Sequence, residues 1–92
     1  MGEFVQGSLG YLRSGTVVEV VLSGAASEVF LADDANVRKL ERGDVSGFRG
    51  YGGPFDRSPV RLGVPSSGRW NVVVIPMGRT VSVTSVRWFA AA

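Results

Sequence analysis

The sequence contains neither cysteine nor histidine in its 92 residues. Without cysteine the chain has no disulfide, no thiol nucleophile and no thiolate metal ligand, and without histidine it has no Ser-His-Asp triad and lacks the usual zinc ligand. Lys39 is the single lysine, so a Schiff-base or Ser-Lys mechanism would depend on that one residue. We therefore expect a protein that is not an enzyme and that holds no cofactor and no metal.

Long apolar runs are also missing. The longest, Val72 to Met77, is interrupted by Pro76 and is far shorter than the roughly 20 residues that a membrane span needs. The start of the chain, Met1 to Phe4, has neither the basic region nor the apolar region of a secretory signal. We expect a soluble, cytoplasmic protein without a membrane partner.

The length of 92 residues suits one compact domain and leaves no room for a second core, so residues 1–92 are expected to form a single domain. Charge is distributed unevenly: residues 1–46 carry four basic and seven acidic groups, and residues 47–92 carry six basic groups and one acidic group. An anionic partner would suit the second half. We favour the simpler interpretation that a Greek-key chain interleaves the two halves and mixes their charges.

Short runs rich in β-branched residues alternate with glycine, proline and serine, a pattern typical of β-sandwiches. Alternation predicts strands at residues 16–22, 28–32, 58–64, 70–75 and 80–89, and a weaker one at residues 4–12. Glu19 would face outward. The residues predicted to be buried are Val18, Val20, Val60, Leu62, Trp70, Val72, Val74, Val81 and Val83. We predict an all-β fold, a small β-sandwich of about seven to eight mainly antiparallel strands with one short helix.

The last predicted strand shows a change of phase. Its apolar residues slip from Val83 to Val86, and one extra residue near Thr84 and Ser85, a β-bulge, would restore the inward face. Residues 77–79 before it are predicted to form a tight hairpin. The large residues Trp88 and Phe89 are assigned to the core.

The short helix is predicted near residues 34–42. Asp33 supplies an acidic N-cap, basic residues follow toward the end, and Gly43 comes after the last turn. Val37 and Leu40 would pack on the sandwich. Asp33, Asp34 and Asn36 could instead offer oxygens to calcium, but their number and spacing do not match a calcium loop, so capping is favoured.

Residues 47–54, which hold four glycines, are predicted to be a loop. The run Gly50 to Gly53 resembles a phosphate cradle but lacks the lysine and the following helix of a P-loop. Arginines near aromatic residues, as in Arg49 with Tyr51, are also used to hold single-stranded nucleic acid. Because alternation places Trp70 in the core, we expect no nucleic-acid binding above a weak nonspecific level.

Three segments of the chain resemble one bacterial family. Residues 58–74 are similar to the signature of domain of unknown function 1883, and residues 30–36 and 51–53 resemble the same family in the same order. The resemblance extends from about Tyr11 to Trp88. It implies a small β-sandwich with no assigned activity, found alone or joined to a TIR domain in bacterial proteins. A TIR-domain effector as partner would make this chain a recognition or assembly module.

A binding surface is expected on the loops, because the sheet faces of so small a domain are used to form the core. Two segments qualify, residues 33–36 and 48–55, and the ends of a Greek-key sandwich could bring them together with Arg69. Tyr51 is the expected anchor; alternatively its ring folds back over the sandwich and binds nothing. The candidate binding residues are Asp33, Asp34, Asn36, Arg49, Tyr51 and Arg69.

We therefore predict a non-enzymatic binding or sensing module whose ligand is a small molecule or a protein. One alternative is a structural domain that forms homo-oligomers through its strand edges. Another is a weak binder of nucleic acid or of an anionic ligand, using the arginines of the second half.

Overall fold

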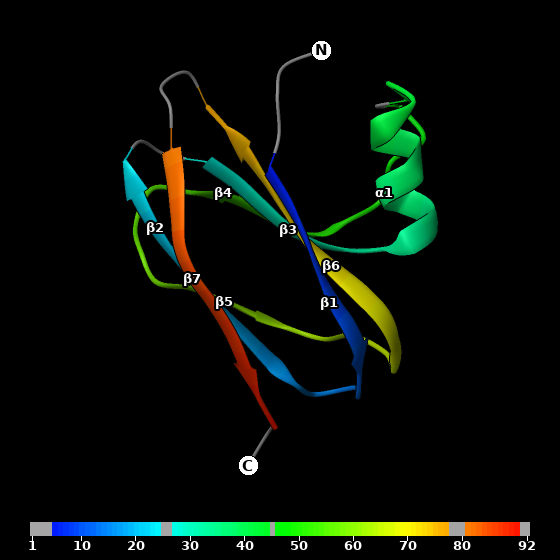
Figure 1. Cartoon of the computed structure of the whole chain (residues 1–92), viewed down its shortest axis with the longest axis horizontal. Helices are drawn as coiled ribbons and strands as arrows, with labels where there is room; N and C mark the ends of the chain where they lie inside the picture. Colours follow the sequence, from blue (N-terminus) through cyan, green and yellow to red (C-terminus); the bar gives the residue numbers. More distant parts are fainter. Residues whose placement is uncertain (1–4, 25–26, 45, 78–80, 91–92) are drawn as a thin grey trace.

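The computed structural model describes residues 5–24, 27–44, 46–77 and 81–90. In these residues the chain forms seven strands and one helix (Figure 1). The elements are β1 (Val5–Leu12), β2 (Val17–Gly24), β3 (Ser27–Asp33), α1 (Asp34–Glu41), β4 (Tyr51–Phe55), β5 (Val60–Gly63), β6 (Gly68–Pro76) and β7 (Val81–Phe89). No helix in this part of the chain is long and apolar enough to cross a membrane.

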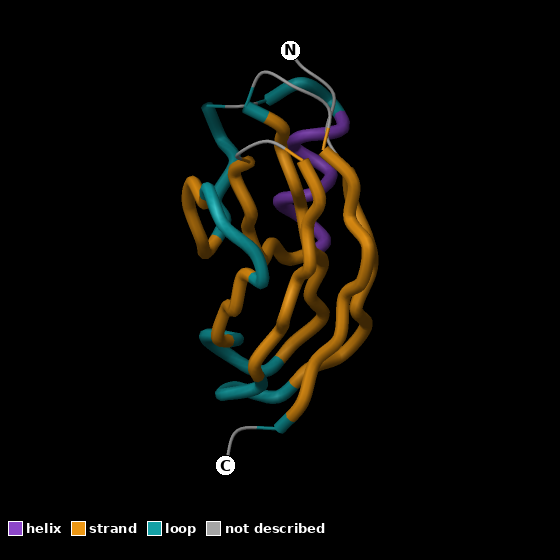
Figure 2. Tube along the Cα trace, turned by 90° about the vertical axis from the view of Figure 1, so that its left-hand side faces the viewer, coloured by secondary structure: helices purple, strands orange, loops and turns teal. Residues whose placement is uncertain are grey.

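The strands form two antiparallel sheets, with the orders β1-β6-β3-β4 and β5-β2-β7. This arrangement confirms the predicted small β-sandwich. Figure 1 shows α1 beside β3 and β6, on the side of the molecule away from β2 and β7. In the view turned by 90° the strands run along the length of the molecule and α1 lies beside their upper half (Figure 2).

The apolar residues form two clusters. The main cluster lies between the sheets and is built from Leu9, Leu12, Val18, Val20, Val29, Leu31, Val60, Val64, Trp70, Val72 and Val74. A second cluster joins α1 to the sheet that contains β6, through Val37, Leu40, Ala32 and Val73. Because Val73 faces α1 while its neighbours Val72 and Val74 face the other sheet, β6 is apolar on both faces, as its sequence predicts.

The helix forms where the capping pattern predicts it. Asp33 Oδ1 accepts the backbone N–H of Asn36 at 2.9 Å, which satisfies one of the free donors of the first turn. Gly43 follows the last turn with a φ of +81°, a conformation that costs glycine little. Val37 and Leu40 are buried, as predicted.

The predicted bulge in β7 is also confirmed. Val21 pairs with Ser85 and Leu22 pairs with Val83, so Thr84 is the extra residue. The Thr84 hydroxyl donates to the carbonyl of Val21 at 3.1 Å. The bulge turns Val83 and Val86 toward the main cluster, against which both are packed.

The prediction of a loop throughout residues 47–54 is wrong, because residues 51–55 form β4. This strand pairs with β3, with Tyr51 opposite Leu31 and Gly52 opposite Phe30. Gly52 has a φ of +155°, and a Cβ atom there would overlap the carbonyl oxygen of Val29. Gly52, one of the glycines that indicated a loop, instead allows this close approach of two backbones.

The predicted hairpin at residues 77–79 is wrong as well, since β6 and β7 belong to different sheets. Residues 78–80 themselves lie outside the described residues. Trp88 and Phe89, predicted to be core, are each 45% exposed. Neighbours in a strand point to opposite faces of the sheet, so the two residues could not both face the core, and they lie at the end of an edge strand. The other predicted core residues on described side chains are buried or packed against the main cluster; the Val81 side chain lies outside the described part.

Candidate ligand-binding cleft

A cleft of about 220 Å³ lies where the start of α1, the start of β4 and the turn before β6 meet. It is lined by Asp33, Asn36, Arg49, Tyr51, Ser66, Ser67, Gly68, Arg69 and Trp70. All of the predicted binding residues except Asp34 are in this lining, and Asp34 forms an ion pair with Arg69. The structure therefore brings the two predicted segments and Arg69 together at one place.

Asp33 and Asn36 link α1 to the segment before β4. Asp33 Oδ1 accepts the Asn36 side-chain amide at 2.8 Å in addition to its backbone N–H. Asn36 Oδ1 in turn accepts the backbone N–H of Arg49 at 2.7 Å. These oxygens are thus engaged in capping and in loop attachment. No group of three or more potential metal-ligating side chains occurs in the described part of the chain.

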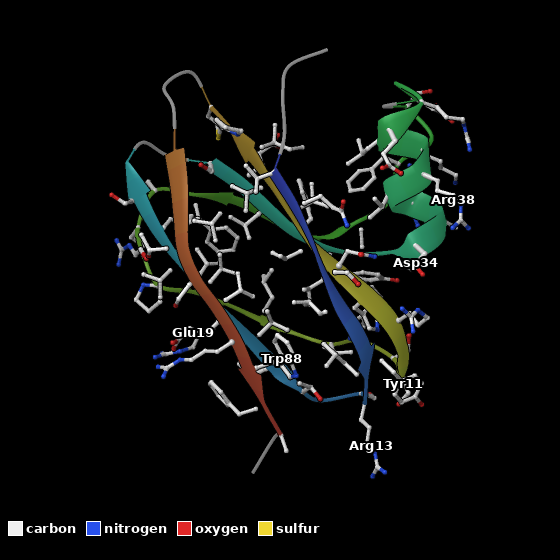
Figure 3. All side chains as sticks on the ribbon, viewed as in Figure 1. Tyr11, Arg13, Glu19, Asp34, Arg38 and Trp88 are labelled. Carbon is white, nitrogen blue, oxygen red and sulfur yellow. The ribbon has the colours of Figure 1, made fainter. Side chains whose placement is uncertain are left out.

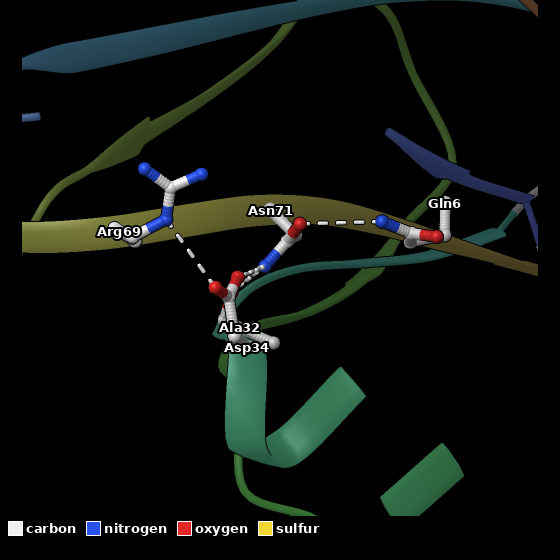
Figure 4. A network of polar contacts seen from close by, with 5 residues as sticks. All are labelled: Gln6, Ala32, Asp34, Arg69 and Asn71. Atoms are coloured by element: carbon white, nitrogen blue, oxygen red, sulfur yellow. Dashed lines mark hydrogen bonds and ion pairs between the residues drawn. The ribbon is translucent and has the colours of Figure 1, made fainter. Parts of the chain in front are cut away.

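A polar network centred on the buried Asn71 supports Arg69 (Figure 4). Asn71, 3% exposed, donates through Nδ2 to the Ala32 carbonyl at 3.2 Å and to Asp34 Oδ1 at 2.8 Å. Its Oδ1 accepts from the Gln6 side chain at 3.2 Å. Asp34 Oδ2 accepts from Arg69 Nε at 3.4 Å. The network therefore connects β1, β6 and α1 to the arginine of the cleft.

The same network holds Asp34 ionised. The hydrogen bond from Asn71 lowers the pKa of Asp34 most, Arg69 and the charge of Arg38 lower it further, and desolvation works in the opposite direction. Asn71 was not among the predicted site residues. A polar asparagine inside the otherwise apolar run from Trp70 to Ile75 is the signal that could have identified it.

Tyr51 and Trp70 form the aromatic part of the cleft. Trp70 is 5% exposed, which confirms its place in the core, and its indole N–H donates to the Ser66 carbonyl at 2.8 Å. The Tyr51 ring meets it edge to face, with centroids 5.7 Å apart, and remains 55% exposed. Tyr51 is therefore positioned by a buried partner without being covered, the arrangement that its role as an anchor requires.

The groups left open in the cleft are mainly donors. Arg49 donates one hydrogen bond to the Phe48 carbonyl at 3.1 Å and has no carboxylate partner among the described residues. Arg69 uses Nε for Asp34, and its side chain is 65% exposed. The carboxylates of Asp33 and Asp34 are both engaged. The groups of the cleft that remain available to a ligand are therefore two guanidinium groups and an exposed phenol ring.

Comparison with protein-family models gives a match over residues 3–91 to the family described as Domain of unknown function (DUF1883). Comparisons with curated proteins and with solved structures gave no match. The match spans the cleft and both sheets. It confirms the resemblance found in the sequence and leaves the function to be inferred from the geometry.

Proposed function

Because the chain belongs to the DUF1883 family, whose description assigns no activity, we propose from the cleft alone that it is a binding module for a small ligand with an anionic group and a planar ring. The observation that carries this proposal is the open cleft in which an exposed tyrosine ring lies with two arginines whose Nη groups form no ion pair with a carboxylate of the described residues. The domain binds and does not catalyse.

The anionic group follows from the balance of charges. Asp34 offsets part of the charge of Arg69, and Asp33 serves the helix N-cap. Arg49 has no such partner in the described residues. A guanidinium group binds carboxylate or phosphate oxygens through two parallel N–H donors, and such bonds are stronger than bonds between neutral groups. An anion in the cleft would supply the missing partner.

The planar ring follows from Tyr51. Its ring is already held against Trp70, so little conformational freedom remains to be lost when a ligand covers it. Aromatic pairs contribute roughly 0.5 to 1.5 kcal/mol beyond the area that they bury. A ligand ring stacked on Tyr51 would therefore add both affinity and orientation to the ionic contact.

The proposal of binding without catalysis is supported by the state of the acidic side chains at the cleft. A general base must be free to take a proton from a bound substrate. Asp33 Oδ1 is engaged in capping, the lowered pKa of Asp34 beside Asn71 and Arg69 makes that carboxylate a weaker base, and the chain has no histidine or cysteine.

The test is a two-dimensional NMR titration of the ¹⁵N-labelled chain with phenyl phosphate, and with inorganic phosphate as the ring-free comparison. We expect amide shifts at residues 33–36, 49–51 and 66–70, and weaker binding of inorganic phosphate. Arg49→Gln should weaken both probes, and Tyr51→Ala should abolish the preference for phenyl phosphate. Arg42→Gln, the same charge change at the far end of α1, should leave both unchanged.

Equal effects of Arg42→Gln and Arg49→Gln would show nonspecific charge attraction and would reject the cleft as the site. Shifts confined to other surfaces would reject it too.

The family resemblance described above includes members joined to TIR domains. We therefore extend the proposal to a TIR effector as the partner of this chain. A cleft that binds a small ligand beside a TIR effector would act as a sensor. Titration calorimetry between the purified chain and a TIR domain encoded beside it tests this extension. Binding that changes when phenyl phosphate fills the cleft would support a sensing role, and no heat of binding at any ratio would contradict it.

A further inference from the structure

Outside the cleft, the outer face of the sheet β5-β2-β7 carries a buried glutamate between two exposed arginines. Glu19 lies opposite Arg61 on β5 and opposite Arg87 on β7. Arg61 Nε donates to Glu19 Oε2 at 3.0 Å, and Arg87 Nε donates to Oε1 at 2.7 Å. The Glu19 side chain is 4% exposed, whereas those of the arginines are 65% and 69% exposed. Figure 3 shows Glu19 on the opposite side of the molecule from Asp34 and Arg38.

This arrangement fixes the two guanidinium groups and leaves part of each open. Both carboxylate oxygens of Glu19 are used by Nε atoms, and the Nη groups have no partner among the described residues. Two positive charges beside one negative charge leave a net charge of +1. Because Glu19 already restrains both side chains, a partner that binds their Nη groups loses less side-chain entropy.

An exposed ring lies on the same face. Phe89 follows Arg87 by two residues in β7, so both point to the same side of the sheet, and Phe89 is 45% exposed. α1 packs on the other sheet and does not cover this one. Arginine and aromatic residues are the types enriched where proteins bind each other. We call Glu19, Arg61, Arg87 and Phe89 the arginine face.

The spacing of the arginine face suits an extended acidic segment. Arg61 and Arg87 are separated by two strand spacings, roughly 10 Å between backbones, and their side chains converge on one carboxylate. Acidic side chains at positions i and i+2 of an extended chain lie roughly 7 Å apart on one side. A net charge of +1 is too small for single-stranded nucleic acid, which requires a groove that neutralises several phosphates.

We propose that the arginine face docks an extended acidic segment of a partner protein. Carboxylates of the segment bind the Nη groups of Arg61 and Arg87, and an apolar side chain of the segment covers Phe89. This surface is separate from the cleft, and the proposal does not depend on the ligand proposed there.

The test uses the whole chain and a fluorescent synthetic peptide in which glutamate alternates with valine, followed by anisotropy. Arg87→Gln should weaken binding about two- to fivefold, the range for one exposed ion pair. Glu19→Gln, which removes the opposing negative charge, should strengthen it in any variant that remains folded. Arg57→Gln, at a highly exposed arginine outside this face, and Arg49→Gln, in the cleft, are matched controls that should have no effect.

NMR mapping of the peptide-binding site on the wild-type chain is a second measurement that does not require any variant to fold. The peptide should shift amides of β2, β5 and β7 and leave residues 33–36 and 49–51 unchanged. Equal binding of the matching glutamine peptide, stronger binding of oligothymidine, or shifts located in the cleft would each overturn the proposal. So would the absence of binding at millimolar peptide.

Discussion

The Asn36 side chain accepts the backbone N–H of Arg49, with 2.7 Å between the two atoms, across 13 positions of sequence. This single bond attaches the chain just before β4 to the first turn of α1. Arg49 and Tyr51 therefore enter the cleft from a backbone that is fixed by the same helix start that Asp33 caps. The geometry of the cleft depends on this attachment.

Asn36→Ala should loosen the attachment. The substitution removes two side-chain hydrogen bonds, the one that Asn36 accepts from the Arg49 N–H and the one that it donates to Asp33. It should lower the free energy of unfolding by about 1 to 2 kcal/mol, since the usual net value of one hydrogen bond is about 1 kcal/mol. Urea denaturation measures this loss, and the phenyl phosphate titration measures the accompanying loss of affinity. Asn36 is half-buried at the cleft, so Ala35→Ser, on the exposed side of the same turn, is the control. Unchanged stability and affinity in Asn36→Ala would contradict the role of this bond.

Gly52→Ala and Gly53→Ala should differ sharply although the residues are neighbours. A Cβ atom on Gly52 would overlap the carbonyl of Val29, and the φ of this residue is +155°, whereas a Cβ atom on Gly53 would meet nothing within 4 Å. We expect Gly52→Ala to cost about 2 to 4 kcal/mol, from strain and overpacking together. Gly53→Ala should be nearly neutral. Thermal denaturation of both variants checks this, and similar melting temperatures would show that β4 does not pair with β3 at this register.

Acid should destabilise the fold through two carboxylates. Hydrogen bonds from Arg87 and then Arg61 lower the pKa of Glu19, and the bond from Asn71 lowers the pKa of Asp34 most. A carboxyl with a lowered pKa in the folded state stabilises the fold above its unfolded pKa, and this stability is lost as the pH falls through the folded pKa. Stability should therefore decline below about pH 5.

Urea denaturation at a series of pH values measures this decline. Glu19→Gln should be less stable than the wild type at neutral pH and should lose less stability on acidification, and Asp34→Asn should behave in the same way. Glu28→Gln, at a carboxyl that forms no ion pair with another described residue, is the control. An acid profile in Glu19→Gln identical to that of the wild type would show that Glu19 does not carry this dependence.

Trp70→Ala should be one of the most damaging single substitutions. The side chain is 5% exposed, packs in the main cluster and supports Tyr51. Its removal should cost about 3 to 5 kcal/mol and should also release the Tyr51 ring. Trp70→Phe retains most of the packing but loses the bond to the Ser66 carbonyl, so its cost should be smaller. A melting temperature of Trp70→Ala close to that of the wild type would show that this residue is not part of the core.

Features that depend on neighbours along the chain could be predicted from the sequence. Alternation in β2 and β6 placed Val18, Val20, Val72 and Val74 in the core because successive side chains in a strand point to opposite faces. The Asp33 cap and Gly43 marked the limits of α1 through local hydrogen bonds and backbone conformation. The change of phase in β7 predicted the bulge near Thr84 and Ser85, since one extra residue is the simplest local repair, and the structure identifies Thr84 as that residue.

Features that depend on distant partners were decided only by the tertiary structure. The strand β4 could not be predicted from the sequence. Its Gly52 closely approaches the backbone of β3, and the two strands are separated along the chain by α1. Glu19 faces outward as alternation requires, yet it is buried by arginines 42 and 68 positions later in the sequence. The strand order places β7 at an edge of its sheet, and Trp88, on the same side of this strand as Val86, is 45% exposed there. Hydrophobicity and charge thus determined which side chains are stabilised by burial or by a polar partner. The packing of the two sheets determined which of these side chains are buried or paired.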